Sequence, residues 1–412
     1  MAVNGLSYPK DQRKSTGRMS AFDPKMAFGI ESCEPDQPWD EWAFHNRDML
    51  LSLLPAPISA DFQDVFVSGR MDVSVPYDTF RIPAICRTAK GTLLAFAEGR
   101  RSVSDQASNV LVLRRRASRS KAWGPLQVVE RDEPNSLNNP CVLPTRQGRV
   151  WLMYQRYPAG LNEMTAEPGL SRERSCLTYL TFSDDDGRSW SAPRDISAEA
   201  KASNDRSDAS GPGIGIELTR GPHRGRMVFP LNGGGGGKYD VFAVFSDDHG
   251  RTWQRGTVAP KGPDLQPNET QIAELADGSI LMNCRNQAKG RFRLQCRSLD
   301  GGATWSEATP RPDLVDPVCM GSIVRLSFKP DLLAFSNPND PKTRRNGTLR
   351  LSSDCGTTWV PAGVIAPDSF AYSNLCPLPG GRIGILFEQV SDLGGGREGY
   401  RIRYGEWRPT MP

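Results

Sequence analysis

The stretch SDDHGRTW at residues 246–253 fits the pattern Ser-x-Asp-x-Gly-x-(Ser/Thr)-Trp, and this pattern recurs along the chain. The Ser and Asp side chains of such an octapeptide hydrogen-bond to nearby backbone and close a tight turn. Its Gly suits a left-handed backbone position, and its Trp anchors the turn against a neighbouring sheet. The octapeptide therefore predicts a structural hairpin turn rather than a chemical site. Further copies are SDDDGRSW at 183–190, SLDGGATW at 298–305 and SSDCGTTW at 352–359, with a degenerate fifth, RASRSKAW, at 116–123.

The spacing of these octapeptides predicts the architecture. The tryptophans of the four intact copies stand 52 to 63 residues apart, and short apolar runs such as VWLMY at 150–154 and VFAVF at 241–245 lie between the octapeptides. A repeat of about 56 residues holds one four-stranded sheet with its loops, and radial repetition of such sheets gives a β-propeller. Residues 67–412 accommodate six repeats, so we expect an all-β, six-bladed propeller. We also expect the strand at residues 400–404 to pair with the first sheet and close the ring.

The first 66 residues differ from the rest of the chain. They are polar and interrupted by Pro and Gly, so we expect an N-terminal extension over residues 1–66 that is partly disordered. Apolar residues at helical spacing between Trp39 and Leu54, followed by Pro55, predict one short helix near 39–54. No clear signal peptide begins the chain, and the sequence leaves the compartment and the oligomeric state open.

Composition excludes several classes of function. The chain has 412 residues, with 51 Lys and Arg against 47 Asp and Glu, and this balance is not that of a nucleic-acid-binding protein. The three histidines lie far apart, which argues against a histidine zinc site and a Ser-His-Asp triad. No apolar run is long enough to span a membrane, and no cofactor or metal is expected. The nine cysteines read mostly as buried small residues, although Cys284 and Cys296 could face each other across a hairpin centred near Gly290.

Candidate functional residues are those outside the repeats. Four arginines stand at strand positions or strand ends next to apolar residues, where burial would demand an anionic partner. They are Arg81 in FRIP at 80–83, Arg100 in FAEGR at 96–100, Arg285 in NCR at 283–285 and Arg344 shortly before NGTLR at 346–350.

The combination of FRIP with the octapeptides resembles the exo-α-sialidases (neuraminidases) of the bacterial and animal type, over roughly residues 65–407. In that family the octapeptides are called Asp-boxes. The resemblance implies a propeller that hydrolyses terminal α-linked sialic acids on glycans. It also implies a triad of arginines that binds the substrate carboxylate, which here corresponds to Arg81, Arg285 and Arg344.

The same resemblance assigns roles to the remaining site residues. Asp105 resembles the general acid/base on a loop, Glu269 the carboxylate that activates the nucleophile, and Tyr372 the nucleophile. Glu388 resembles the carboxylate that orients Arg81, and Arg100 a supporting residue near Asp105. A tyrosine suits this chemistry because a carboxylate nucleophile would be repelled by the carboxylate on the anomeric carbon, and sialidases are known exceptions to the two-carboxylate scheme. The expected outcome is retention of anomeric configuration.

Several alternatives stay open at the sequence level. Glu274 competes with Glu269, Arg345 competes with Arg344, and Arg101 is a possible ion-pair partner of Asp105. The glycine-rich run at 232–238 fails the P-loop pattern and reads as a hairpin loop that could cover the site. Alternative functions are hydrolysis of a related 2-keto sugar acid such as Kdn or Kdo, transfer of sialic acid to an acceptor, binding of acidic glycans without catalysis, and a purely structural interaction propeller.

Overall fold

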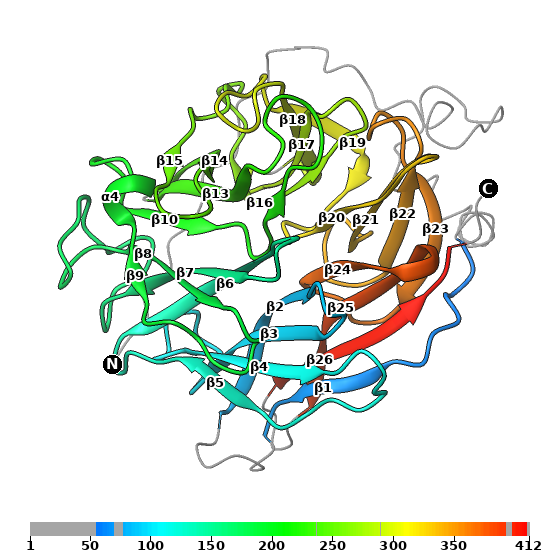
Figure 1. The fold of residues 1–412 in the computed structure, drawn as a ribbon, viewed down its shortest axis with the longest axis horizontal. Helices are drawn as coiled ribbons and strands as arrows, with labels where there is room; N and C mark the ends of the chain where they lie inside the picture. The colour runs from blue at the N-terminus through cyan, green and yellow to red at the C-terminus, as the bar shows by residue number, and fades with distance from the viewer. Residues whose placement is uncertain (1–54, 70–76, 236, 289, 393–397, 410–412) are drawn as a thin grey trace, which may run out of the picture. The chain divides into compact units, whose positions relative to one another are not determined.

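The computed structural model describes residues 55–69, 77–235, 237–288, 290–392 and 398–409. The helix expected near residues 39–54 lies outside the described residues. From residue 55 onward the described chain forms six sheets arranged around a common centre (Figure 1). Their strand pairs are antiparallel except for the parallel pair of β11 with β6. The expectation of an all-β, six-bladed propeller is therefore confirmed.

Each sheet forms one blade. The first blade contains β2 (Thr79–Arg87), β3 (Leu93–Arg100), β4 (Val110–Arg116) and β5 (Gln127–Glu130). The second contains β6 (Ser136–Pro144), β7 (Val150–Tyr157), β8 (Leu177–Ser183), β9 (Arg194–Asp195) and β11 (Gly213–Ile214). The third contains β10 (Ser207–Ser210), β12 (Ile216–Glu217), β13 (Met227–Gly235), β14 (Lys238–Ser246) and β15 (Gln254–Arg255). The fourth contains β16 (Pro267–Glu274), β17 (Ile280–Asn286), β18 (Phe292–Ser298) and β19 (Thr309–Val315). The fifth contains β20 (Ser322–Phe328), β21 (Asp331–Pro338), β22 (Gly347–Ser352) and β23 (Val360–Ala366). A single α-helical turn, α4 (Ser197–Ala200), follows β9.

The sixth blade closes the ring with a strand from the other end of the chain. It contains β24 (Ser373–Leu378), the 3₁₀ turn η1 (Pro379–Gly381), β25 (Arg382–Asp392), β26 (Glu398–Trp407) and β1 (Gln63–Val67), in the order β1-β26-β25-β24. The expectation that residues 400–404 pair with the first sheet is wrong, because β26 pairs with β1 and β25 inside the last sheet (Figure 1). The boundary placed between residues 66 and 67 thus falls inside a strand of the propeller.

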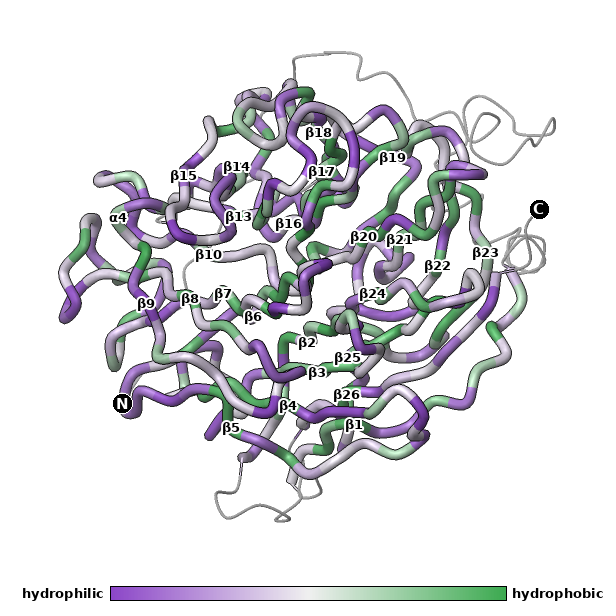
Figure 2. The backbone as a smooth tube through the Cα atoms, in the orientation of Figure 1, coloured by the Kyte–Doolittle hydropathy of each residue, from purple (hydrophilic) through white to green (hydrophobic). Residues whose placement is uncertain are grey.

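The hydrophobic cores lie between neighbouring blades. Phe96 of β3 and Leu152 of β7 share one cluster of buried side chains, and Leu386 of β25 shares another with Val112 of β4. Hydrophobic colour accordingly marks inner strands such as β2 and β3 in Figure 2. A strand between two such cores is buried on both faces, which explains why these strands read as continuous apolar runs rather than as alternating patterns.

The Asp-boxes form the turns predicted for them. In the box at 246–253 the Ser246 hydroxyl donates to Asp248 at 2.9 Å and accepts from the Gly250 amide at 2.9 Å, while Asp248 accepts from both the amide and the hydroxyl of Thr252 at 2.9 and 2.7 Å. Gly250 has φ +83°, and the residue before it, His249, also has φ +62°. A side chain at Gly250 would collide with Trp151 of the preceding blade, so the box is pressed against that blade.

The degenerate copy at 116–123 has lost this geometry and kept its tryptophan. The Ser120 amide donates to the Ala117 carbonyl at 2.8 Å in an ordinary turn. Trp123 still packs edge-on against Tyr404 of the last blade, with ring centroids 5.3 Å apart. The anchoring role of the tryptophan therefore survives the loss of the turn sequence.

Candidate active site

The eight residues singled out in the sequence lie on inner strands, or on the loops that join them, at one end of the propeller. Arg81 is on β2, Arg100 ends β3, and Arg285 is on β17. The other five are Asp105 in the β3–β4 loop, Glu269 on β16, Arg344 in the β21–β22 loop, Tyr372 directly before β24 and Glu388 on β25. Four of the six blades, the first, fourth, fifth and sixth, thus contribute to one cluster.

Glu388 fixes Arg81 through a bidentate ion pair. The Arg81 Nε and Nη2 atoms donate to the two carboxylate oxygens of Glu388 at 3.0 and 2.9 Å, and Glu388 is fully buried. Glu388 also accepts from the backbone amide of Ile82 at 2.7 Å. Ile82 has φ +60°, a left-handed conformation that costs a β-branched residue about 1–3 kcal/mol. The FRIP motif is therefore a strained bulge that aims Arg81 and is held in place by Glu388.

Tyr372, Glu269 and Arg285 form a hydrogen-bonded triangle. The Tyr372 hydroxyl donates to Glu269 Oε1. Arg285 Nη1 donates to Glu269 Oε2 at 2.6 Å and to the Tyr372 hydroxyl oxygen at 3.0 Å. Burial and the charge of Glu269 raise the pKa of Tyr372 well above its ordinary value, against the opposing charges of Arg285 and Arg344. The phenol is thus protonated at neutral pH and hydrogen-bonded to a carboxylate able to accept its proton.

Arg344 completes the cationic side of the site. Its guanidinium lies 5.4 Å from the centre of the Tyr372 ring, and that of Arg81 lies 5.2 Å from the same ring. Arg344 Nη2 donates to the Val318 carbonyl at 3.3 Å. Among the described residues, Arg344 is the only one of the four site arginines that forms no ion pair. Its charge is therefore free to meet an incoming anion.

Asp105 stands at the opposite side of Arg81 from Glu388. Its side chain is 68% exposed, with Oδ1 4.0 Å from Arg81 Nη1 and 2.7 Å from Arg100 Nη1. Arg100 is itself buried against Glu98, to which its Nη2 donates at 2.6 Å. Partial desolvation raises the pKa of Asp105, but the charge and hydrogen bond of Arg100, helped by Arg81 and Arg344, outweigh it. The pKa consequently lies below its ordinary value.

The structure separates the alternatives that the sequence left open. Glu274 accepts from the amides of Thr219 and Arg220 at 2.8 and 2.7 Å, at the far end of β16 from Glu269. Arg345 is exposed and pairs with Asp340 at 2.7 Å. Arg101 pairs with Glu133 rather than with Asp105. None of these three side chains joins the cluster.

Two acidic residues near the cluster are not among the candidates selected from the sequence. Glu98 belongs to FAEGR and is fully buried, where it accepts a hydrogen bond from Arg100. The signal in the sequence that could have indicated this ion pair is the separation of two residues between Glu98 and Arg100 in one strand. Glu163, in the β7–β8 loop, accepts from the Tyr239 hydroxyl at 3.1 Å beside the glycine-rich β13–β14 hairpin. Burial raises the pKa of Glu163, partly offset by Tyr239, and the charges of Glu269, Arg285 and Asp105 also act on it. Glu163 therefore lies near the cluster, on a loop of the second blade that contacts Tyr239 of the third.

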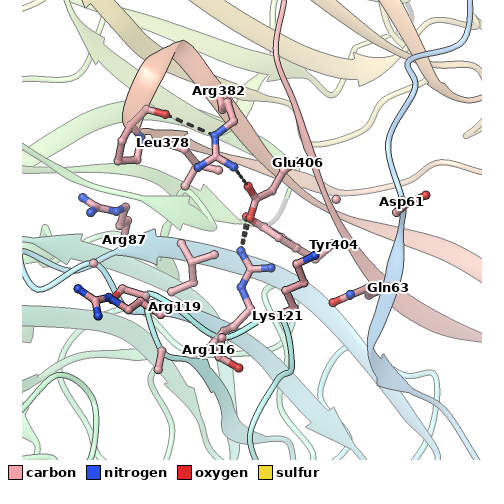
Figure 3. A pocket seen from close by; sticks show the side chains of 17 residues that line it. Asp61, Gln63, Arg87, Arg116, Arg119, Lys121, Leu378, Arg382, Tyr404 and Glu406 are labelled. Atoms are coloured by element: carbon pink, nitrogen blue, oxygen red, sulfur yellow. Dashed lines mark hydrogen bonds and ion pairs between the residues drawn. The ribbon is translucent and has the colours of Figure 1, made fainter.

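A separate basic pocket lies at the other ends of the same strands. It has a volume of about 470 Å³ and includes Arg87 at the end of β2, Leu378 at the end of β24, and the degenerate Asp-box (Figure 3). Arg116 and Arg382 both bind Glu406 there. Because Arg81 and Tyr372 sit at the opposite strand ends, this pocket is not the candidate active site.

The described residues contain no group of three or more His, Cys, Asp or Glu side chains arranged to hold a metal ion. The eight described cysteines are free thiols. Cys284 and Cys296 lie on the paired strands β17 and β18, where they are diagonal neighbours rather than directly opposite. No helix within the described ranges has the length and apolar character to cross a membrane.

Comparison with known proteins identifies the family of the chain. Residues 91–385 match the BNR repeat-like domain family. The chain is 33% identical to a sialidase from Micromonospora viridifaciens over 79% of this chain and 52% of that protein. It is 27% identical to an exo-alpha-sialidase from Aspergillus fumigatus over 86% of this chain and 95% of that protein. It superposes on the solved Hadza microbial sialidase Hz136 with a TM-score of 0.69 and 26% identity, covering 81% of this chain and 66% of that one.

The chain therefore belongs to the family of sialidases with BNR repeats. It spans about half the length of the Micromonospora protein that it matches.

Proposed function

We propose that this protein is a retaining exo-α-sialidase that hydrolyses terminal α-linked sialic acids from glycoconjugates, with Tyr372 as its nucleophile. The observation that carries the proposal is the triangle of Tyr372, Glu269 and Arg285 next to the unpaired charge of Arg344. A binding protein needs anion contacts but has no use for a protonated phenol hydrogen-bonded to a carboxylate. Two relatives of the chain are themselves called sialidases.

In the first step the substrate carboxylate is bound by Arg81, Arg285 and Arg344, because three guanidinium groups match one carboxylate in charge and hydrogen-bond geometry. Glu269 takes the phenolic proton as the Tyr372 oxygen attacks the anomeric carbon. Arg285 stabilises the charge that develops on that oxygen, since its Nη1 already contacts it at 3.0 Å. Asp105 gives its proton to the departing glycosidic oxygen.

In the second step water attacks the glycosyl–tyrosine intermediate. Asp105, now ionised, accepts a proton from that water, and the Tyr372 oxygen leaves and regains its proton from Glu269. Two displacements at one carbon retain its configuration. Glu388 takes no part in proton transfer, because its two carboxylate oxygens are occupied by Arg81 and by the backbone amide of Ile82.

The test is turnover of α2,3-sialyllactose and of the 4-methylumbelliferyl α-glycoside of N-acetylneuraminic acid. We expect Tyr372→Phe to lower kcat by at least about 1,000-fold on both substrates. Asp105→Ala should lower turnover of sialyllactose by about 100- to 10,000-fold. Tyr404→Phe is the matched control, because Tyr404 is an equally buried tyrosine whose hydroxyl lies 3.2 Å from Glu406 at the opposite strand ends.

The product identifies the reaction. The first sugar seen by NMR should be the α-anomer, and added methanol should yield the methyl α-glycoside. A β-anomer would contradict retention and the tyrosine nucleophile. Formation of sialylated acceptor in place of free sugar would assign transfer. Turnover of Kdn or Kdo glycosides alone would assign a related sugar acid, and sialic acid binding without any turnover would assign a glycan-binding propeller.

A further inference from the structure

The side chain proposed as general acid sits on an exposed loop. Asp105 lies between β3 and β4 and its side chain is 68% exposed, so packing contributes little to its position. A general acid must nevertheless be held within about 0.5 Å of a productive position. The Arg100 hydrogen bond at 2.7 Å restrains the ionised carboxylate, but it weakens when Asp105 is protonated to act as an acid.

The main chain of Asp105 has two further restraints. Its carbonyl oxygen accepts from Asn109 Nδ2 at 2.6 Å and from Asn138 Nδ2 at 2.6 Å. Asn109 precedes β4 in the first blade and Asn138 lies on β6 in the second, and both are buried. These two donors occupy both lone pairs of the Asp105 carbonyl oxygen, so its hydrogen-bonding capacity is fully used. Neither bond depends on the protonation of the Asp105 carboxyl group.

Buried Glu98 orients both amides. Its Oε2 accepts from Asn109 Nδ2 at 3.1 Å, from Asn138 Nδ2 at 3.4 Å and from Arg100 Nε at 2.8 Å. A carboxylate and a carbonyl oxygen only accept hydrogen bonds, so the amide nitrogens must face them. Glu98 thereby links the two asparagines to the arginine that contacts the Asp105 side chain.

We propose that Asn109 and Asn138 are positioning residues for the general acid, because their side-chain amides hold the main-chain carbonyl of Asp105 and keep its carboxyl group in place while it is protonated. This inference rests on the proposed function, in which Asp105 protonates the leaving oxygen. The two asparagines act through Asp105 and have no contact with the nucleophile pair. Their loss should therefore be felt where acid catalysis is needed and little elsewhere.

The experiment compares kcat/KM for two leaving groups in the full chain carrying Asn109→Ala or Asn138→Ala. The glycosidic oxygen of α2,3-sialyllactose must be protonated as lactose leaves, because a sugar alkoxide is a poor leaving group. 4-Nitrophenyl α-N-acetylneuraminide instead releases a stable phenolate without protonation. kcat/KM includes departure of the leaving group and excludes hydrolysis of the intermediate. We expect each variant to lose about 10- to 100-fold on sialyllactose and less than about 3-fold on the nitrophenyl glycoside. The ratio of the two values is independent of how much of the sample is folded.

Two reference variants make the ratio interpretable. Asp105→Ala should shift it in the same direction and further. Asn337→Ala should leave it unchanged within about 2-fold, because Asn337 is an equally buried asparagine whose Nδ2 contacts the Val315 carbonyl at 2.8 Å and Asp316 at 3.2 Å, away from Asp105. Asn109→Ser and Asn138→Ser replace the alanine variants if those do not fold, since the shorter hydroxyl cannot span the same two acceptors.

Equal losses on both substrates in the asparagine variants, with a shifted ratio in Asp105→Ala, would overturn the positioning role and leave the proposed function intact. Equal losses in Asp105→Ala itself would instead overturn the role of Asp105 as general acid.

Discussion

At the scale of single residues, three of the four site arginines are paired with carboxylates. Glu388 holds Arg81, Glu269 holds Arg285, and Asp105 and Glu98 share Arg100. Pairing keeps buried charges compensated before any substrate arrives. A bound carboxylate changes this balance, because it adds one negative charge beside Arg81 and Arg344, two of the groups that lower the pKa of Asp105.

This balance predicts a pH dependence. As the proposed general acid, Asp105 can donate a proton only in its neutral form. In the free protein its pKa lies below the ordinary value, so kcat/KM for sialyllactose should fall as the pH rises from the acidic range. With substrate bound, the arginines are partly neutralised and the pKa rises. The decline in kcat should therefore begin at higher pH than the decline in kcat/KM. Rate profiles between pH about 4 and 8 test this, and coincident declines would contradict it.

Residue patterns in the sequence anticipated the positions that the structure brings together, but not what supports them. Arg81 and Tyr372 stand in short motifs that resemble a known family, so one sequence is enough to select them. Asn109 and Asn138 stand in no motif, and their importance depends on the main-chain carbonyl of Asp105, to which both donate. A contact between a side chain and a main-chain carbonyl leaves no trace in residue types, because every residue has such a carbonyl.

At the scale of elements, the Asp-box is a turn held by one carboxylate. The sequence predicted its hydrogen bonds and its glycine, but not the second left-handed residue, because His249 and its equivalents vary in type. Hydrogen bonds from the amide and hydroxyl of Thr252, and from Ser246, lower the pKa of Asp248 to about 2. Similar bonds outweigh partial desolvation and lower the pKa values of Asp300 and Asp354.

A lowered pKa makes this turn sensitive to acid. The stability that Asp248 contributes is present above its ordinary pKa near 3.8 and is lost as the pH falls through about 2. We expect Asp248→Asn to lower the free energy of unfolding by about 1 kcal/mol at neutral pH, and the difference from the native chain should shrink below pH about 4. Urea unfolding at several pH values measures both. The exposed Asp264, mutated to Asn, is the control, and a difference that persists at low pH would contradict the argument.

At the scale of the whole molecule, the seam between the first and last blades differs from the other five junctions. Here the last sheet takes its outer strand from the N-terminal side, with Asp64 paired to Arg403 and Val67 to Arg401. The sequence located the closing region but gave the wrong partner, since β1 has only five residues and carries little pattern of its own. Strand pairing between chain ends depends on global geometry, which local periodicity does not encode.

The seam should respond strongly to one core substitution. Phe66 of β1 is 1% exposed and packs on Phe80 of β2, with ring centroids 5.4 Å apart. We expect Phe66→Ala to lower the free energy of unfolding by about 3–5 kcal/mol. Gln63→Ala, on an exposed position of the same strand, should change it by less than about 0.5 kcal/mol. Urea denaturation compares them, and a loss below about 1 kcal/mol for Phe66→Ala would show that β1 is dispensable for closure.

The pairing of β1 with β26 also sets the order of events during protein synthesis. β1 is among the first segments of the propeller to leave the ribosome, and β26 is the last. The five complete sheets can form as translation proceeds, because each is built from consecutive or nearby strands. β1 must wait unpaired until β26 has been translated, so the nascent chain carries an open strand edge until the last strand of the propeller is available.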